Sequence, residues 1–155
     1  MSIQKITPFL WFDNQAEEAA RLYTSIFPNS KIVKVVRFTA AGPGPAGSAM
    51  TVAFELEGQK FVALNGGPIY KFTEAVSFVV NCQTQDEVDH YWQKLSEGGA
   101  EIQCGWLKDK FGLCWQIVPT VLPELLSGPD PAKAQRVMKV MFTMKKLDIR
   151  ALQEA

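Results

Sequence analysis

The side chains best suited to ligand chemistry are polar residues within strand-like segments. Residues 105–119 read GWLKDKFGLCWQIVP, in which two short strands flank an Asp-Lys-Phe-Gly turn. Gln116 lies in the second strand, where alternation with Trp115 directs the two side chains to opposite faces. The Gln116 amide could orient a ligand, or it could be satisfied by neighbouring backbone. The sequence leaves both interpretations open.

Asn65, Ser77 and Trp106 are the other candidate ligand contacts. Asn65 and Ser77 carry the same argument as Gln116, because each is a hydrogen-bonding side chain within or beside a strand-like segment. Trp106 could line an aromatic pocket, although large aromatic residues in strands are mostly core. Asp109 lies in the turn, where aspartate commonly binds its own backbone, so we expect a structural role for it.

Residues for nucleophilic catalysis are sparse. His90 is the single histidine, and its place on a predicted helix favours a surface or packing role. The sequence therefore offers few residues for a catalytic Ser/His/Asp or Cys/His arrangement. Cys82, Cys104 and Cys114 lack CxxC spacing, and we expect each to be a small buried apolar residue in a strand. No catalytic residue is assigned.

The first half of the chain predicts one helix and four strands to position these residues. Asp13-Asn14 can cap a helix whose apolar positions recur at helical spacing and which Pro28-Asn29 ends. Glu57-Gly58-Gln59 suits a hairpin turn, and the Gly- and Pro-rich stretch 40–47 predicts a loop. The predicted strands are 6–12, 31–38, 49–57 and 60–64.

The same order of strand, helix and three further strands recurs about 70 residues later in the chain. A strand at 76–81 and a helix at 85–97 precede three short strands at 101–104, 106–108 and 114–118. Two such modules predict an α+β fold. The two βαβββ units are expected at 1–70 and 71–119, and together they would curl into a cupped mixed sheet. Residues 1–155 are expected to form a single domain.

The tail, residues 120–155, does not repeat the strand pattern of the two modules. A helical turn at 122–126, a helix opening at Pro131 and a helix at 148–154 are predicted. Met138, Met141 and Met144 give the tail an adaptable apolar face. Packing on the same chain or on a partner subunit both fit this pattern, with a dimer contact slightly favoured.

Composition excludes several classes of function. The 155 residues carry 16 Lys and Arg and 16 Asp and Glu, so the formal net charge is zero. A neutral chain without a basic cluster has no bulk attraction to phosphate backbones, and nucleic acid is not an expected partner. There is no signal-peptide pattern and no apolar run near the ~20 residues that span a bilayer. We expect a cytoplasmic protein with no membrane partner.

Several segments together resemble the vicinal-oxygen-chelate superfamily, which includes the glyoxalases, bleomycin-resistance proteins and extradiol dioxygenases. More narrowly, they resemble its PhnB-like or 3-demethylubiquinone methyltransferase-like branch. The resemblance implies paired βαβββ modules, a cupped sheet and a homodimer. The segments that carry it are ITPFLWFD at 6–13, AEEA at 16–19, SIFPNS at 25–30, residues 105–119, RVMK at 136–139 and MKKLD at 144–148.

The resemblance also implies where metal ligands would stand. In metal-binding members of the superfamily, four ligands come from the strands, and here those positions fall within 6–8, 62–65 and 75–77 and on Gln116. None is His, Asp or Glu, the donors that such metals need. We therefore expect no metal, and no Lewis-acid chemistry at the usual site.

The resulting hypothesis is a metal-free protein that binds a small molecule in an apolar pocket without a cofactor. An aromatic or quinone-like ligand would suit that pocket. The alternative is a transferase or lyase acting on a quinone-like metabolite, as the family label implies. S-adenosylmethionine enters only under that alternative, because the chain lacks the glycine-rich turn between strand and helix of the usual methyltransferase fold.

Overall fold

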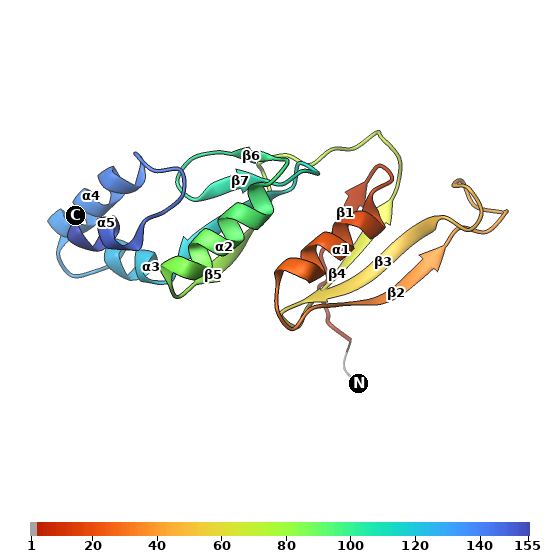
Figure 1. The fold of residues 1–155 in the computed structure, drawn as a ribbon, viewed down its shortest axis with the longest axis horizontal. Coiled ribbons are helices and arrows are strands. Elements are labelled where there is room, and N and C mark those ends of the chain that lie inside the picture. The colour runs from red at the N-terminus through yellow and green to blue at the C-terminus, as the bar shows by residue number, and fades with distance from the viewer. Residues whose placement is uncertain (1–2) are drawn as a thin grey trace. The chain divides into compact units, whose positions relative to one another are not determined.

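A computed structural model describes residues 3–155, and the chain forms two compact units. The first unit ends at Lys71 and the second spans Phe72–Ala155. Both carry a strand, a helix and three further strands in that order (Figure 1). The repeat predicted from the sequence is thus confirmed, and so is the α+β fold class.

Unit 1 is a four-stranded mixed sheet covered by one helix. In the sheet order β1-β4-β3-β2, β1 pairs with β4 in parallel and the other pairs are antiparallel. The Glu57-Gly58 turn joins β3 to β4 with positive φ at both residues, as the hairpin prediction requires. The elements are β1 (Phe9–Phe12), α1 (Ala16–Ile26), β2 (Lys31–Arg37), β3 (Ala49–Leu56) and β4 (Gln59–Asn65).

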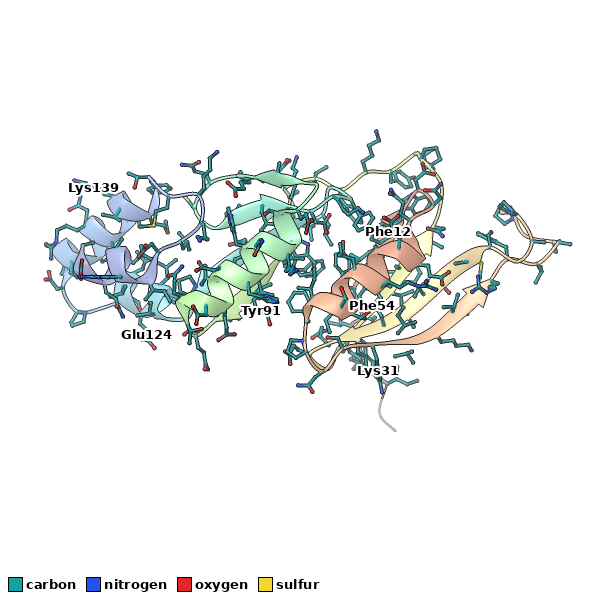
Figure 2. The ribbon with its side chains drawn as sticks, viewed as in Figure 1. Phe12, Lys31, Phe54, Tyr91, Glu124 and Lys139 are labelled. Carbon is teal, nitrogen blue, oxygen red and sulfur yellow. The ribbon has the colours of Figure 1, made fainter. Side chains whose placement is uncertain are left out.

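The core of unit 1 lies between α1 and the sheet. Small residues of α1 let the helix approach closely, because Ala16, Ala19 and Ala20 are fully buried. Phe12 and Phe54, labelled beside α1 in Figure 2, are buried below them. The sheet face under α1 is therefore closed by apolar packing.

Unit 2 repeats this topology with shorter outer strands. Its order β5-β8-β7-β6 again pairs the first and last strands in parallel. Val88, Tyr91, Trp92 and Leu95 of the helix are buried, as the helical spacing predicts. The elements are β5 (Ser77–Cys82), α2 (Gln85–Ser96), β6 (Ala100–Glu101), β7 (Trp106–Lys108) and β8 (Cys114–Pro119).

Three helices follow in the tail, drawn in blue in Figure 1: α3 (Val121–Leu126), α4 (Pro131–Met141) and α5 (Ile149–Glu154). Asp130 and Asp148 cap α4 and α5 through their carboxylates. A cluster of four buried residues holds the three helices together, namely Leu122, Val137, Leu147 and Leu152. Within residues 3–155, no helix is long and apolar enough to cross a membrane.

Several local predictions are wrong, and the strand predicted at 6–12 begins only at Phe9. The strand predicted at 101–104 ends at Glu101, because Cys104 has φ +56° and forms a turn with Gly105, so Cys104 is also not a strand residue. Neither Asp13 nor Asn14 caps α1, since its N-cap residue is Gln15, which makes no side-chain cap bond. The three methionines do not share one face.

Their packing separates the methionines. Met141 and Met144 pack against the tail cluster, whereas Met138 is 45% exposed on α4. The tail therefore buries most of its methionine surface on its own chain.

Candidate functional site

Unit 1 contains a pocket of about 750 Å³ at one end of its sheet. Both β1 and β4 end there, and β3 begins there, beside the loop that joins β2 to β3. Its apolar wall includes Trp11, Phe38, Met50 and Leu64. A pocket of this volume suits a small organic molecule.

The aromatic wall of the pocket is rigid at Trp11. Its indole Nε1 donates to the backbone oxygen of Gly67 over 2.9 Å. Its ring meets Tyr70 edge-on, with centroids 4.9 Å apart. The backbone of Gly66 lies flat against the indole, since a Cβ there would be 2.3 Å from Cζ2 of Trp11. Backbone and ring together fix the position of the indole.

Asn65 also lines this pocket, but its amide already binds the protein at both ends. Oδ1 accepts from the backbone N–H of Ala16 over 2.8 Å, and Nδ2 donates to the backbone oxygen of Ala49 over 3.0 Å. Asn65 thereby supplies the cap bond at the start of α1 that Gln15 does not make. Its predicted contact with a ligand stays a prediction.

Charged groups stand at the edge of the pocket. Nη1 of Arg37 lies 3.8 Å from Oε1 of Glu17 and donates to the backbone oxygen of Gly47 over 3.3 Å. The other carboxylate oxygen of Glu17 binds Arg21. Because the Arg37 side chain is half exposed, this ion pair contributes little to stability and can rearrange around a ligand.

The three other predicted site residues come together in unit 2. Nε2 of Gln116 donates to Oγ of Ser77 over 2.9 Å, across the parallel pair of β8 and β5. Trp106 lies directly opposite Gln116 in the antiparallel pair of β7 and β8. Trp115, the neighbour of Gln116, is buried on the helix-covered face, so this polar group lies on the open face of the sheet.

The turn within residues 105–119 is built around a buried carboxylate. Oδ1 of Asp109 accepts from the backbone N–H groups of Phe111 and Leu113 at 2.9 and 3.0 Å. Oδ2 accepts from Nε1 of Trp115 over 3.0 Å. The predicted structural role of Asp109 is confirmed. Its bond to Trp115 was not predicted, because it depends on the hairpin bringing the two residues together.

The thiols of the two buried cysteines are poor nucleophiles. Burial, together with the charge of Glu87, raises the pKa of Cys82 to about 12. Burial likewise raises the pKa of Cys114 above its ordinary value. A thiol that stays protonated at neutral pH does not attack a substrate. His90 is exposed on α2, as predicted.

A family model described as 3-demethylubiquinone-9 3-methyltransferase matches residues 4–118 of this chain. The solved PhnB protein of Bacillus cereus is 38% identical, with 76% of this chain covering 100% of that one at a TM-score of 0.70. The chain belongs to this PhnB-like family of the vicinal-oxygen-chelate superfamily.

More distant structures share the fold with this PhnB-like protein. Protein PA1353 of Pseudomonas aeruginosa is 21% identical with a TM-score of 0.62, over 76% of this chain and 98% of that one. The fosfomycin resistance protein FosX of Listeria monocytogenes is 16% identical with a TM-score of 0.58, over 83% and 100%. At these identities the likeness shows the fold alone. A search of curated proteins found no match.

The side chains of this PhnB-like protein do not fit the metal site of the superfamily's metal-binding members. Among residues 3–155, no three His, Cys, Asp or Glu side chains gather where they could hold an ion. The amides of Asn65 and Gln116 are bound to Ala16, Ala49 and Ser77. The described side chains therefore do not supply the His, Asp or Glu donors that such a metal site needs.

Proposed function

We propose that this PhnB-like protein binds a small, largely apolar organic molecule without a metal ion or cofactor. The observation that carries the proposal is the pocket of about 750 Å³ in unit 1. Protein pockets for small molecules combine an apolar wall with a few polar groups that orient the ligand. The rings of Trp11 and Phe38 provide such a wall, and Arg37 and Glu17 provide polar groups at its edge.

An aromatic or quinone-like ligand suits this wall, because flat rings pack on fixed aromatic side chains. Asn65 is a candidate contact through the second lone pair of Oδ1. The open face of the second sheet offers a separate set of candidate contacts, Ser77, Trp106 and Gln116. There the amide oxygen of Gln116 is available to accept a hydrogen bond while Nε2 binds Ser77.

A titration with decylubiquinone tests the proposal. This quinone has a fully substituted ring, so it cannot add a cysteine thiol at an open ring carbon. We expect saturable binding by calorimetry and quenching of tryptophan fluorescence.

Met50→Asp places a charge in the pocket wall and should abolish binding. Met138→Asp is the matched control, because Met138 is 45% exposed on α4 outside the pocket. Equal binding by the two variants, or no binding by the unaltered protein, would refute the proposal.

The family model's description favours a second candidate, a transferase or lyase acting on a quinone-like metabolite. Methyl transfer would require S-adenosylmethionine. Each described sheet has four strands in the order first-fourth-third-second, unlike the doubly wound sheet of the usual methyltransferases. Calorimetric titration with S-adenosylmethionine decides the methyltransferase version, which fails if no heat is released.

We also propose that the protein is a homodimer. Large apolar side chains stay exposed on the described units, among them Ile69 at 72%, Val76 at 64% and Tyr70 at 63%. Exposed apolar surface of this kind favours association. Sedimentation velocity should give twice the chain mass of 17.2 kDa. The mass of a single chain at micromolar concentration would contradict the dimer.

A further inference from the structure

The C-terminal tail binds the first turn of α2 through one glutamine side chain. Nε2 of Gln85 donates to the backbone oxygen of Leu147 over 3.1 Å, and its Oε1 accepts from the backbone N–H of Ile149 over 2.8 Å. Nε2 also donates to Asp89, whose carboxylate pairs with Lys146 at 2.8 Å. These donors lower the pKa of Asp89. One side chain therefore fixes the segment that leads into α5.

The same tail segment binds the turn between β6 and β7. Met144 and Lys145 accept, through their backbone oxygens, from the N–H groups of Cys104 and Gly105 at 2.9 and 2.8 Å. Both turn residues have positive φ, +56° and +84°. The backbone oxygens of the tail thus bind both N–H groups of a turn with positive φ angles, which residues other than glycine rarely adopt.

Gly105 is enclosed between the tail and the sheet. A Cβ at this position would lie 2.9 Å from the backbone oxygen of Ile117 and 3.0 Å from Cδ1 of the fully buried Leu147. The backbone oxygen of Gly105 also accepts from the N–H of Ile117 over 2.7 Å. Glycine is the residue that fits both the φ angle and this space.

The turn leads directly into the candidate contacts of unit 2. Trp106 follows Gly105, and its backbone N–H and oxygen are bound to Gln103 and Ile102 at 3.0 and 2.9 Å. Across β7 and β8, Trp106 faces Gln116. A displacement of the turn would therefore move Trp106 relative to Gln116.

We propose that the tail acts as a clamp that positions Trp106 beside Gln116, and that Gln85 is the positioning residue of this clamp. The tail lies outside the residues that the family model matches, which end at residue 118. The inference rests on the proposed function only in taking Trp106 and Gln116 as ligand contacts.

The test compares Gln85→Ala with Arg150→Ala in the full-length protein. Gln85→Ala removes the clamp bonds to residues 147 and 149, whereas Arg150→Ala removes only an exposed pair with Glu154 in the same tail. The readout is the indole N–H resonance of each tryptophan in ¹⁵N-labelled protein, assigned with Trp→Phe variants. We expect the Trp106 resonance to shift and broaden in Gln85→Ala only, while that of Trp11 in unit 1 stays unchanged.

Two further variants test the same contacts. Gln85→Glu keeps the acceptor for Ile149 but places a carboxylate oxygen against the backbone oxygen of Leu147 and the carboxylate of Asp89, so it should shift Trp106 at least as far as Gln85→Ala. Gly105→Ala disturbs the turn itself and should shift Trp106 in the same way as Gln85→Ala. A Gln85→Ala protein with a lowered melting temperature and an unchanged Trp106 resonance would overturn the clamp, since Gln85 would then only stabilise the tail.

Decylubiquinone binding separates this inference from the proposed function. If Trp106 contacts a ligand bound on the open face of unit 2, Gln85→Ala should weaken binding at that face about three- to tenfold, the effect of about one hydrogen bond, and should leave binding in the unit 1 pocket unchanged. If the unaltered protein does not bind decylubiquinone, the proposed ligand class fails, and the tryptophan resonances alone confirm or overturn the clamp.

Discussion

Replacement of Asn65 by alanine should destabilise unit 1 more than an average substitution at a half-buried position. The change removes two hydrogen bonds, the 2.8 Å bond from the N–H of Ala16 and the 3.0 Å bond to the oxygen of Ala49. Ala16 is fully buried and Ala49 is 7% exposed, so water has little access to the groups left behind. Both groups would pay a desolvation penalty in addition to the lost bonds.

The expected magnitude follows from these two groups. Loss of a helix N-cap costs about 1 kcal/mol, and a buried backbone group without a partner costs about 1–3 kcal/mol. We therefore expect Asn65→Ala to lower the free energy of unfolding by about 2–4 kcal/mol. For a chain of this size, that corresponds to a fall in Tm of about 4–16 °C.

Urea unfolding followed by circular dichroism measures this change, and Asn65→Asp is the matched comparison. Aspartate keeps the acceptor for the N–H of Ala16 at the positive end of α1, but it replaces the donor to Ala49 by a carboxylate oxygen. It should therefore lose less stability than alanine at neutral pH. A loss below 0.5 kcal/mol for Asn65→Ala, taken as about the spread of ordinary surface substitutions, would show that Asn65 does not cap α1.

Three further changes test other parts of the structure. Asp109→Asn should lower the free energy of unfolding by about 2–3 kcal/mol in urea, because a buried amide cannot accept all three of the bonds that the carboxylate accepts. Gly66→Ala should shift the fluorescence of Trp11 and cost about 1–3 kcal/mol, because its Cβ would lie 2.3 Å from the indole. Gly128→Ala is the control, because its Cβ would lie 3.5 Å from the nearest atom. It should leave the fluorescence of Trp11 and the free energy of unfolding unchanged. Because the pKa of Cys82 rises to about 12 on folding, the unfolded chain releases that thiol proton first, so stability should fall as pH rises from about 9 towards 12. Thermal unfolding at a series of pH values should show a fall in Tm over this range that is smaller in Cys82→Ala. An equal slope of Tm against pH in both proteins would exclude a contribution from Cys82.

The secondary structure was largely predictable because its signals are local. Alternating and helical apolar patterns identified β3, α1 and α2 to within a residue or two at each end. The turn at Glu57-Gly58 was predictable from residue type alone. The strand expected at 101–104 failed because Cys104 adopts a positive φ that its residue type does not indicate, and the tail supplies the partner for its N–H.

The candidate site was only partly predictable. Period-two alternation directed Gln116 and Trp115 to opposite faces of the strand, and the structure brings Gln116 together with Ser77 and Trp106 in unit 2. The same pattern gave no sign that the amide of Asn65 caps α1. No local signal could have shown this, because the bond joins residues 49 positions apart in the chain.

The amino-acid sequence by itself determined the element order, the repeat, the family and the lack of a metal-ligand pattern, because each depends on residue types at short spacing. Tertiary structure decided which polar groups are already bound, where the pocket lies and what the tail contacts. Gln85 and Leu147 are 62 positions apart, and their hydrogen bond exists only because the tail folds back onto α2. Packing between distant segments decides such contacts, and it leaves no periodic trace in the sequence.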